Sequence, residues 1–285
     1  MTVTKIKGGI RVSSVLHFNP AHTFLCGQCF RWEQEADQSF TGIAGGQVVN
    51  ISHKDSTLTI LNAAADDYEH FWKNYLDLER DYGEIKENLA RDSIMKKAIR
   101  FGWGIRILRQ DFFECLISFI VSANNNIPRI QGILNRFSEM YGDKLEFEGK
   151  TYYAFPRPEQ LIGITEGDLA PLRAGYRARY LAETINSFCR GEISEEYIAS
   201  LPPKEARREL CKICGVGPKV ADCILLFSMG MFGVFPVDVW VRRVMSELYG
   251  CDENEAAAAG EGMFGPLSGI AQQYLFYWRR EGNTL

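Results

Sequence analysis

Residues 204–228 read KEARRELCKICGVGPKVADCILLFS and contain the most informative turn in the chain. The apolar spacing predicts a first helix ending at about Ile213 and a second helix beginning at Pro218, joined by the tight turn CGVG. Gly215 and Gly217 permit positive φ and let backbone N–H groups approach a ligand. Pro suits the first helical position because its missing N–H would have no partner there. The turn is therefore expected to hold a phosphate group.

A hairpin of this type binds a DNA phosphate without reading sequence, so it positions a protein on DNA. The alternative is a simple corner between two helices in which the glycines allow close packing. Lys219 favours a catalytic role, because the positive end of the helix dipole and partial burial would both favour a neutral, nucleophilic amine. Asp238 follows in FPVDVWVRR at a predicted helix N-cap. The alternatives are a surface lysine and an aspartate that only caps.

The remaining sequence predicts an α+β fold. Short apolar runs between turn residues predict antiparallel strands from about Val12 to Leu61, and from Asp66 onward the apolar spacing becomes helical. We expect an N-terminal antiparallel β-sheet subdomain packed on a mostly α-helical body that contains a helix-hairpin-helix motif at about 204–229. The expected division is 1–100 for the sheet-rich subdomain with its following helices and 101–285 for the helical body.

Composition limits the class of protein. The chain has 285 residues, 46% of them hydrophobic, and a net charge of −4, so any DNA-binding surface must be local. No stretch approaches the roughly 20 apolar residues that span a bilayer, and the N-terminus lacks an apolar signal core. We expect a cytoplasmic protein, nucleoid-associated in a bacterium. Two basic clusters could contact DNA or form solvated helix faces: Arg173, Arg177 and Arg179, and Lys204, Arg207 and Arg208.

The eight cysteines are interpreted as reduced thiols, because no secretory signal accompanies them. Two pairs, Cys26/Cys29 and Cys211/Cys214, have the spacing of zinc ligands. Each pair lies inside a segment that has another explanation, so we expect no metal site.

Several blocks of the sequence resemble one family. CGVGPKVADC followed by FPVDVWVRR is similar to the helix-hairpin-helix DNA glycosylases, and specifically to their 8-oxoguanine DNA glycosylase branch. The resemblance covers nearly the whole chain, with further similar blocks in the same order: LCGQCFRW (25–32), ILRQDFFECLISFIVSANNNIPRI (107–130), AGYRARYL (174–181) and IAQQYLF (270–276).

The resemblance implies excision of 8-oxoguanine from duplex DNA. Lys219 would attack C1′ as the glycosidic bond breaks, and Asp238 would stabilise the positive charge that develops on the sugar. The resulting Schiff base permits β-elimination, so slower strand nicking is expected. The route needs no cofactor, and the sequence lacks the cysteine cluster of the iron–sulfur branch.

The resemblance also assigns recognition of the damaged base. 8-Oxoguanine carries a proton on N7 where guanine has a lone pair, so an acceptor distinguishes them. The backbone carbonyl of Gly27 would be that acceptor. Cys223 and Phe276 would sandwich the base, and Gln272 would bond its Watson–Crick edge. The alternatives are a turn glycine and ordinary core residues.

A base inside a duplex must be flipped out before it can be excised. The resemblance implies that Asn124 fills the vacated space and Tyr176 wedges beside the orphaned cytosine. Arg129 and Arg177 would donate to that cytosine. Gly215, Gly217 and Trp240 would contact DNA phosphates. Trp240 replaces a histidine common in animal members, and Cys214 replaces a proline.

The expected partner is duplex DNA containing oxidised guanine, bound by a monomer away from any membrane. Two alternative functions remain open on the sequence alone. A glycosylase for another damaged purine is disfavoured because members that act on alkylated purines lack a lysine at position 219. A non-catalytic helix-hairpin-helix DNA-binding protein is disfavoured because Lys219 and Asp238 are both present.

Overall fold

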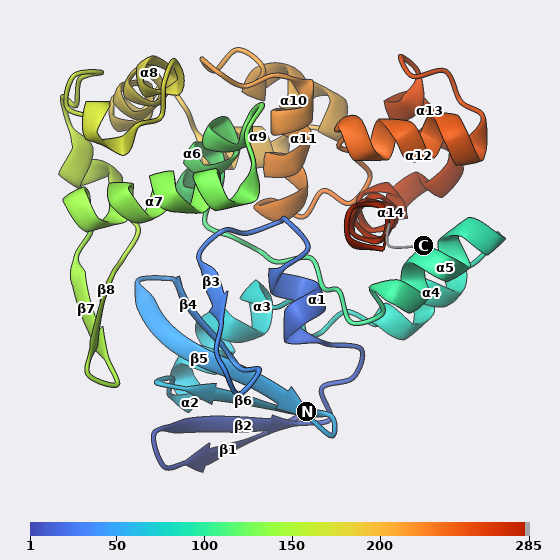
Figure 1. The fold of residues 1–285 in the computed structure, drawn as a ribbon, viewed down its shortest axis with the longest axis horizontal. Coiled ribbons are helices and arrows are strands. Elements are labelled where there is room, and N and C mark those ends of the chain that lie inside the picture. The colour runs from blue at the N-terminus through green and yellow to red at the C-terminus, as the bar shows by residue number, and fades with distance from the viewer. Residues whose placement is uncertain (283–285) are drawn as a thin grey trace.

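The computed structural model describes residues 1–282 and confirms the α+β fold (Figure 1). The N-terminal part is an antiparallel sheet of six strands in the order β1-β2-β6-β5-β4-β3. These strands are β1 (Thr2–Ile6), β2 (Gly9–Ser13), β3 (Trp32–Gln34), β4 (Phe40–Ala44), β5 (Gln47–Lys54) and β6 (Thr57–Leu61). The sheet starts about ten residues before the predicted Val12. The prediction missed β1 because this edge strand is mostly exposed and has little apolar pattern.

The central hairpin shows how the sequence specifies this sheet. Gly45 and Gly46 both have positive φ, which lets a two-residue turn join β4 to β5 with Ala44 opposite Gln47. Apolar side chains of the sheet then pack on the short helix α1 (Pro20–Phe24), where the rings of Phe24 and Trp32 stack 3.9 Å apart.

Helices form the rest of the described chain, apart from one small hairpin. The α-helices beyond α1 are α2 (Ala65–Asp67), α3 (Lys73–Tyr75), α4 (Tyr82–Leu89), α5 (Ser93–Phe101), α6 (Phe112–Ser122), α7 (Ile127–Tyr141), α8 (Arg177–Cys189), α9 (Glu195–Ser200), α10 (Pro203–Leu210), α11 (Pro218–Phe227), α12 (Val239–Tyr249), α13 (Ala256–Phe264) and α14 (Ser268–Glu281). A π-helical turn, Tyr68–Trp72, lies between α2 and α3. Three 3₁₀ turns cover Pro158–Leu161, Ala170–Leu172 and Gly265–Leu267. The hairpin of β7 (Lys144–Phe147) and β8 (Lys150–Tyr153) was not predicted. No helix within residues 1–282 is long and apolar enough to cross a membrane.

The hydrophobic interior has two parts. One part packs the sheet with residues up to Leu78 and with Leu108, and the other packs the helical body together with Cys26 and Phe30. Side chains of α4 and α5 belong to the helical part, so the proposed division at residue 100 cuts between α5 and the body it packs against. Apart from Cys26, Phe30 and Leu108, hydrophobic packing places the boundary near residue 80.

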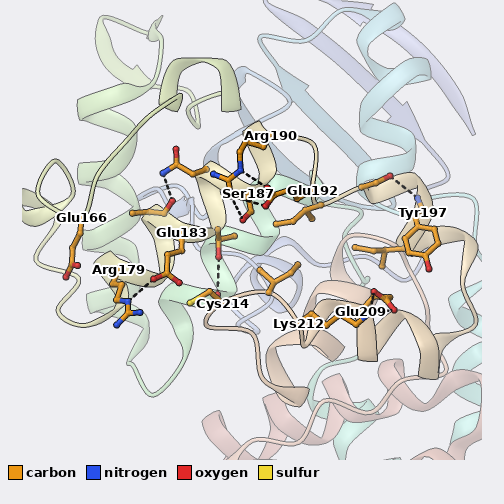
Figure 2. A pocket seen from close by; sticks show the side chains of 17 residues that line it. Glu166, Arg179, Glu183, Ser187, Arg190, Glu192, Tyr197, Glu209, Lys212 and Cys214 are labelled. Carbon is orange, nitrogen blue, oxygen red and sulfur yellow. Dashed lines mark hydrogen bonds and ion pairs between the residues drawn. The ribbon is translucent and has the colours of Figure 1, made fainter.

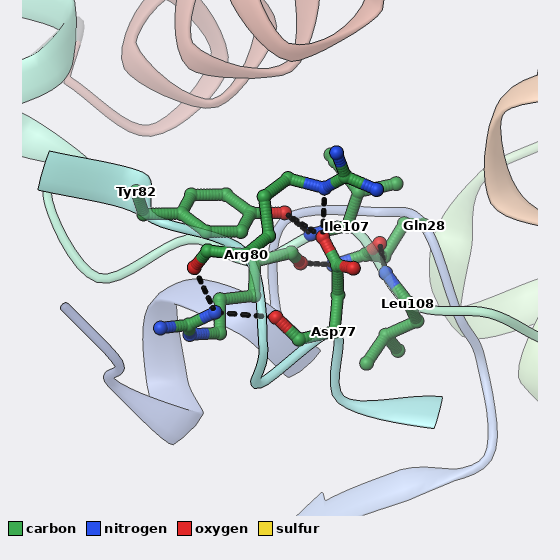
Figure 3. A network of polar contacts seen from close by, with 7 residues as sticks. Gln28, Asp77, Arg80, Tyr82, Ile107 and Leu108 are labelled. Carbon is green, nitrogen blue, oxygen red and sulfur yellow. Dashed lines mark hydrogen bonds and ion pairs between the residues drawn. The ribbon is translucent and has the colours of Figure 1, made fainter. Parts of the chain in front are cut away.

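A buried polar network joins the two parts (Figure 3). The Tyr82 hydroxyl donates to the Asp77 carboxylate at 2.9 Å and accepts from the Ile107 amide at 2.8 Å. Arg106 is 3% exposed and donates to the carbonyls of Asp77 and Leu16. Segment 105–110 thereby binds the sheet part to the helices.

Candidate active site

The hairpin between α10 and α11 is the element on which the site is built. α10 ends at Leu210, three residues before the predicted Ile213, and hydrogen-bonded turns continue to Val216. Gly215 has φ +81° and faces Tyr180, where a Cβ would lie 2.9 Å from that side chain. Gly217 was also expected to use positive φ, but its φ is −95°. It is instead the N-cap of α11 and provides no side-chain acceptor, so the first N–H groups of the helix stay open to a phosphate.

Lys219 is the second residue of α11 and is half-buried. Its Nζ atom lies 5.2 Å from the centre of the Phe119 ring. Cys223 lies one helical turn further along, and its burial raises the thiol pKa to about 11, against the opposing effect of the nearby Lys219 amine. Cys223 therefore presents an uncharged side chain beside the amine.

Asp238 is the predicted N-cap of α12. Its Oδ1 accepts hydrogen bonds from the amides of Trp240 at 3.0 Å and Val241 at 2.9 Å. These two bonds fix the carboxylate at the positive end of the helix. The side chain also borders the same cavity as Lys219.

One small cavity collects the predicted catalytic and base-recognition residues. Its lining residues come from segments far apart in the sequence: Gly27, Phe119, Lys219, Cys223, Phe227, Pro236, Asp238, Gln272, Gln273 and Phe276. The cavity offers about 30 Å³ to the centres of water molecules, which is room for about two waters. A purine can enter only if side chains such as Phe276 move.

Gly27 must be glycine at the edge of this cavity. Its φ is +83°, and a Cβ would lie 2.7 Å from Nη1 of Arg280 and 3.0 Å from Cε1 of Phe276. Gln272, on α14, is 4% exposed, and its Oε1 has no hydrogen-bond partner within the described residues. A buried acceptor of this kind is costly unless a ligand pairs with it.

The predicted duplex-insertion residues lie together outside the cavity. Asn124 is exposed with φ +49°, Arg129 is exposed, and Tyr176 is 54% exposed. Nη2 of Arg129 lies 3.9 Å from where a Cβ of Gly175 would be, next to Tyr176.

Arg177 differs from the other insertion residues. It is 3% exposed, and its guanidinium donates to the carbonyls of Ala123 and Asn124. In this structure it holds the turn that carries Asn124. Its predicted contact with cytosine requires those bonds to be exchanged.

Trp240 is half-buried in the first turn of α12, two residues after Asp238, with the Arg243 guanidinium 5.4 Å from the centre of its ring. The tryptophan therefore has a cationic neighbour on the face where a phosphate contact was predicted.

The basic clusters are only partly free to bind DNA. Arg207 forms ion pairs with Asp222 and Glu261, and the exposed Arg179 pairs with Glu183 at 2.8 Å. Arg207 is therefore a structural residue.

All eight cysteines are free thiols. Cys26 and Cys29 are buried, whereas Cys211 is exposed and Cys214 is half-buried. Within residues 1–282, no group of three or more His, Cys, Asp or Glu side chains is arranged to hold a metal ion.

Sequence reasoning missed Phe119, Phe227, Pro236 and Gln273 as lining residues. The adjacent pair Gln272–Gln273, flanked on both sides by apolar residues of α14, was the available signal for Gln273. A larger cavity, of about 980 Å³, lies elsewhere and is lined by residues of α8, α9 and the end of α10, among them Glu183, Tyr197 and Glu209 (Figure 2). Several of its charged side chains pair with one another, as Arg190 does with Glu192 at 2.6 Å and Lys212 with Glu209 at 2.6 Å.

The fold, the hairpin and the Lys–Asp pair define a helix-hairpin-helix DNA glycosylase. Comparison with family models agrees. Residues 11–116 match the 8-oxoguanine DNA glycosylase N-terminal domain, and residues 117–261 match the HhH-GPD superfamily of base excision DNA repair proteins.

Relatives point to one family within this class. The chain is 33% identical to the N-glycosylase/DNA lyase of Saccharomyces cerevisiae, over 82% of this chain and 69% of that protein. It is 29% identical to the N-glycosylase/DNA lyase OGG1 of Arabidopsis thaliana, over 89% and 75% of the two chains. The Clostridium acetobutylicum 8-oxoguanine glycosylase/lyase, solved with double-stranded DNA containing cytosine opposite 8-oxoG, is 46% identical over 99% of each chain, with a TM-score of 0.97. The chain belongs to the 8-oxoguanine DNA glycosylase family.

Proposed function

We propose that this chain is a bifunctional DNA glycosylase/lyase that excises 8-oxoguanine opposite cytosine from duplex DNA in base excision repair. The convergence of Lys219, Asp238, Gly27 and Gln272 on one cavity carries the proposal. An amine, a carboxylate and two base-recognising acceptors in one place provide for both the chemistry and the choice of base.

Lys219 is the nucleophile of the proposed reaction. Its amine forms a bond to C1′ as the bond from C1′ to N9 of the base breaks, and the base leaves with a proton. Asp238, fixed by the α12 amides, stabilises the positive charge that develops on the sugar. Ring opening then gives the Schiff base, loss of a C2′ proton follows, and the bond from C3′ to its phosphate oxygen breaks.

Recognition of the damaged base follows from the cavity. The Gly27 carbonyl accepts the N7 proton, and the amide of Gln272 pairs with the Watson–Crick edge. Cys223 and Phe276 enclose the two faces of the base once Phe276 has moved.

The exposed residues outside the cavity contact the rest of the duplex. Asn124 fills the gap, Tyr176 separates the neighbouring bases, and Arg129 donates to the orphaned cytosine. Arg177 supports the same contact after it exchanges its bonds to residues 123 and 124.

Binding and location complete the proposal. Amides at Gly215 and Gly217, with the Trp240 indole, contact phosphates on either side of the flipped nucleotide. The protein acts as a monomer on DNA without a cofactor. Since its substrate is genomic DNA, we place it in the cytoplasm, with the nucleoid in a bacterium.

Borohydride trapping tests the chemistry directly. The wild-type protein is incubated with a duplex carrying 8-oxoguanine opposite cytosine, and Lys219→Gln and an undamaged duplex serve as controls. We expect a covalent adduct only between wild type and the damaged duplex, because borohydride reduces the Schiff base to a stable amine.

Two other results would change the assignment. If neither an adduct nor free base is found, the protein binds DNA but lacks this activity. Free base without an adduct would mean that water is the nucleophile and that Lys219 has another role.

A further inference from the structure

The loop 25–28 is held by side chains from other parts of the chain. Nη2 of Arg280 donates to the carbonyl of Leu25 at 2.6 Å. Nε2 of Gln273 donates to the carbonyl of Cys26 at 2.6 Å, in a buried contact that spans 247 residues of sequence. The carbonyl of Gln28 accepts from Nε2 of Gln110 at 2.7 Å.

Gly27 is the exception in this loop. Within residues 1–282, its carbonyl accepts no hydrogen bond, although the carbonyls of Cys26 and Gln28 on either side each accept one from a glutamine side chain. The residue that carries this free acceptor lines the cavity.

The residue after Gly27 is fixed equally firmly. The side chain of Gln28 is fully buried and donates to the carbonyls of Thr23 and Arg106, each at 2.8 Å. Its Oε1 accepts from the amide of Leu108 at 2.9 Å (Figure 3). The peptide group before Gly27 and both the side chain and the carbonyl of Gln28 after it are therefore anchored to different elements, and they flank the peptide group that carries the Gly27 carbonyl.

Anchoring matters because glycine rotates more freely about φ and ψ than any other residue. A Gly27 carbonyl that could turn away would lose the N7 proton of 8-oxoguanine. It would also stop opposing the N7 lone pair of guanine, since two acceptors that face each other repel only while they are held in place.

We propose that Gln273 is a specificity-determining positioning residue, which holds the Gly27 carbonyl toward N7 and so maintains the discrimination between 8-oxoguanine and guanine. This inference rests on the proposed function. Gln110 performs the same task on the other side of the loop, from a segment whose Gln110 amide is bonded to the Phe227 carbonyl at the end of α11.

The rival interpretation is that Gln273 only fills space, since it is 2% exposed. Gln273→Met separates the two, because methionine fills a similar volume but cannot donate a hydrogen bond. Gln34→Met is the matched control. It removes a glutamine that also donates one bond, at 2.9 Å to Gln38, on the exposed surface of the sheet.

The experiment measures dissociation constants for two duplexes that differ only in 8-oxoguanine or guanine opposite cytosine. The Lys219→Gln background prevents turnover. We expect Gln273→Met to lower the ratio of the two affinities about 3- to 10-fold, the effect of one hydrogen bond. Gln34→Met should leave the ratio unchanged. With Lys219 intact, Gln273→Met should slow excision of 8-oxoguanine more than nicking of an abasic duplex, in which no base reaches Gly27.

An unchanged affinity ratio would overturn the inference, and so would equal losses in excision and abasic nicking, which indicate a purely structural role. If Gln273→Met does not fold, Gln110→Met gives the same comparison from the other side of the loop. Failure of the proposed function has a different signature, because wild-type protein would then show neither excision nor trapping, and the inference would fall with it.

Discussion

Asp238 combines a helix cap with a proposed catalytic role in one carboxylate. Oδ1 caps α12 through two amide bonds, as the sequence predicted, while the side chain also borders the cavity with Lys219. The cap and the proposed charge stabilisation need different properties. A cap needs an acceptor oxygen, which asparagine also has, whereas stabilising a cationic sugar needs negative charge.

Asp238→Asn should therefore leave the fold intact and remove the chemistry. We expect excision of 8-oxoguanine to fall by about 100- to 1000-fold, as is typical when an electrostatic group is removed from an active site. Binding of the damaged duplex and the melting temperature should change little, because asparagine caps helices about as well as aspartate. Single-turnover excision, with binding and thermal unfolding as controls, checks this. Near-normal turnover would show that Asp238 only caps the helix.

The residues that the sequence could predict were those whose chemistry is local. Lys219 and Asp238 stand beside a glycine turn and a helix start, so the motif identified them. The pair Gln272–Gln273 could have marked Gln273 as a lining residue, but its bond to Cys26 could not be predicted, because that partner lies 247 residues away and a buried hydrogen bond leaves no pattern in the sequence. Arg177 looked like a free cation in a basic stretch, but its donors are used by backbone carbonyls.

At the scale of elements, Arg207 links the helices around the site through ion pairs. From α10 it pairs with Asp222 on α11 and Glu261 on α13. Burial raises the pKa of Asp222 to about 6, although the Arg207 guanidinium opposes the shift. Asp222 lies one turn after Lys219, so its ion pair with Arg207 fixes the helix that carries the amine.

The raised pKa predicts how stability depends on pH. Folded Asp222 takes up a proton more readily than unfolded Asp222, so its contribution to stability is greatest below about pH 4 and is lost as pH rises through about 6. Asp222→Asn removes this term. The free energy of unfolding of wild type minus that of the variant should therefore fall by on the order of 2–3 kcal/mol between pH 4 and 7.

Urea unfolding at several pH values measures that difference, and subtracting the variant cancels groups common to both proteins. A difference that stays flat, or that rises with pH, would show that Arg207 and not burial dominates the ionisation of Asp222.

Elements with strong periodicity were predictable and short exposed ones were not. The helices from Asp66 onward follow buried apolar side chains, such as Tyr82, Ile85 and Leu89 in α4. β1, β7 and β8 are edge or two-stranded elements whose side chains are mostly exposed, so alternation could not reveal them. α10 ended early because its last predicted turn continues as tighter hydrogen-bonded turns into the hairpin.

At the scale of the molecule, the site lies where the two hydrophobic parts meet. Gly27 belongs to the segment that leads into the sheet, while Lys219 and Gln272 belong to the helical body. The sequence predicted both parts but not how they are fixed to each other, because the joint is a polar network between distant residues. Its centre is Arg106, buried between the carbonyls of Leu16, Asp77 and Arg80.

Arg106→Met should uncouple the two parts. Methionine fills much of the same space but leaves buried carbonyls without a donor, at a cost of about 1–3 kcal/mol for each that stays unpaired. Since the sheet and the helical body have separate hydrophobic interiors, we expect wild type to unfold in one transition and Arg106→Met in two, with the smaller sheet part melting first. Calorimetry measures this, with the exposed Arg100→Met as the matched control. One transition shifted to lower temperature, with equal calorimetric and van't Hoff enthalpies, would instead show that apolar contacts between the parts suffice to keep Gly27 and Lys219 in one cooperative unit.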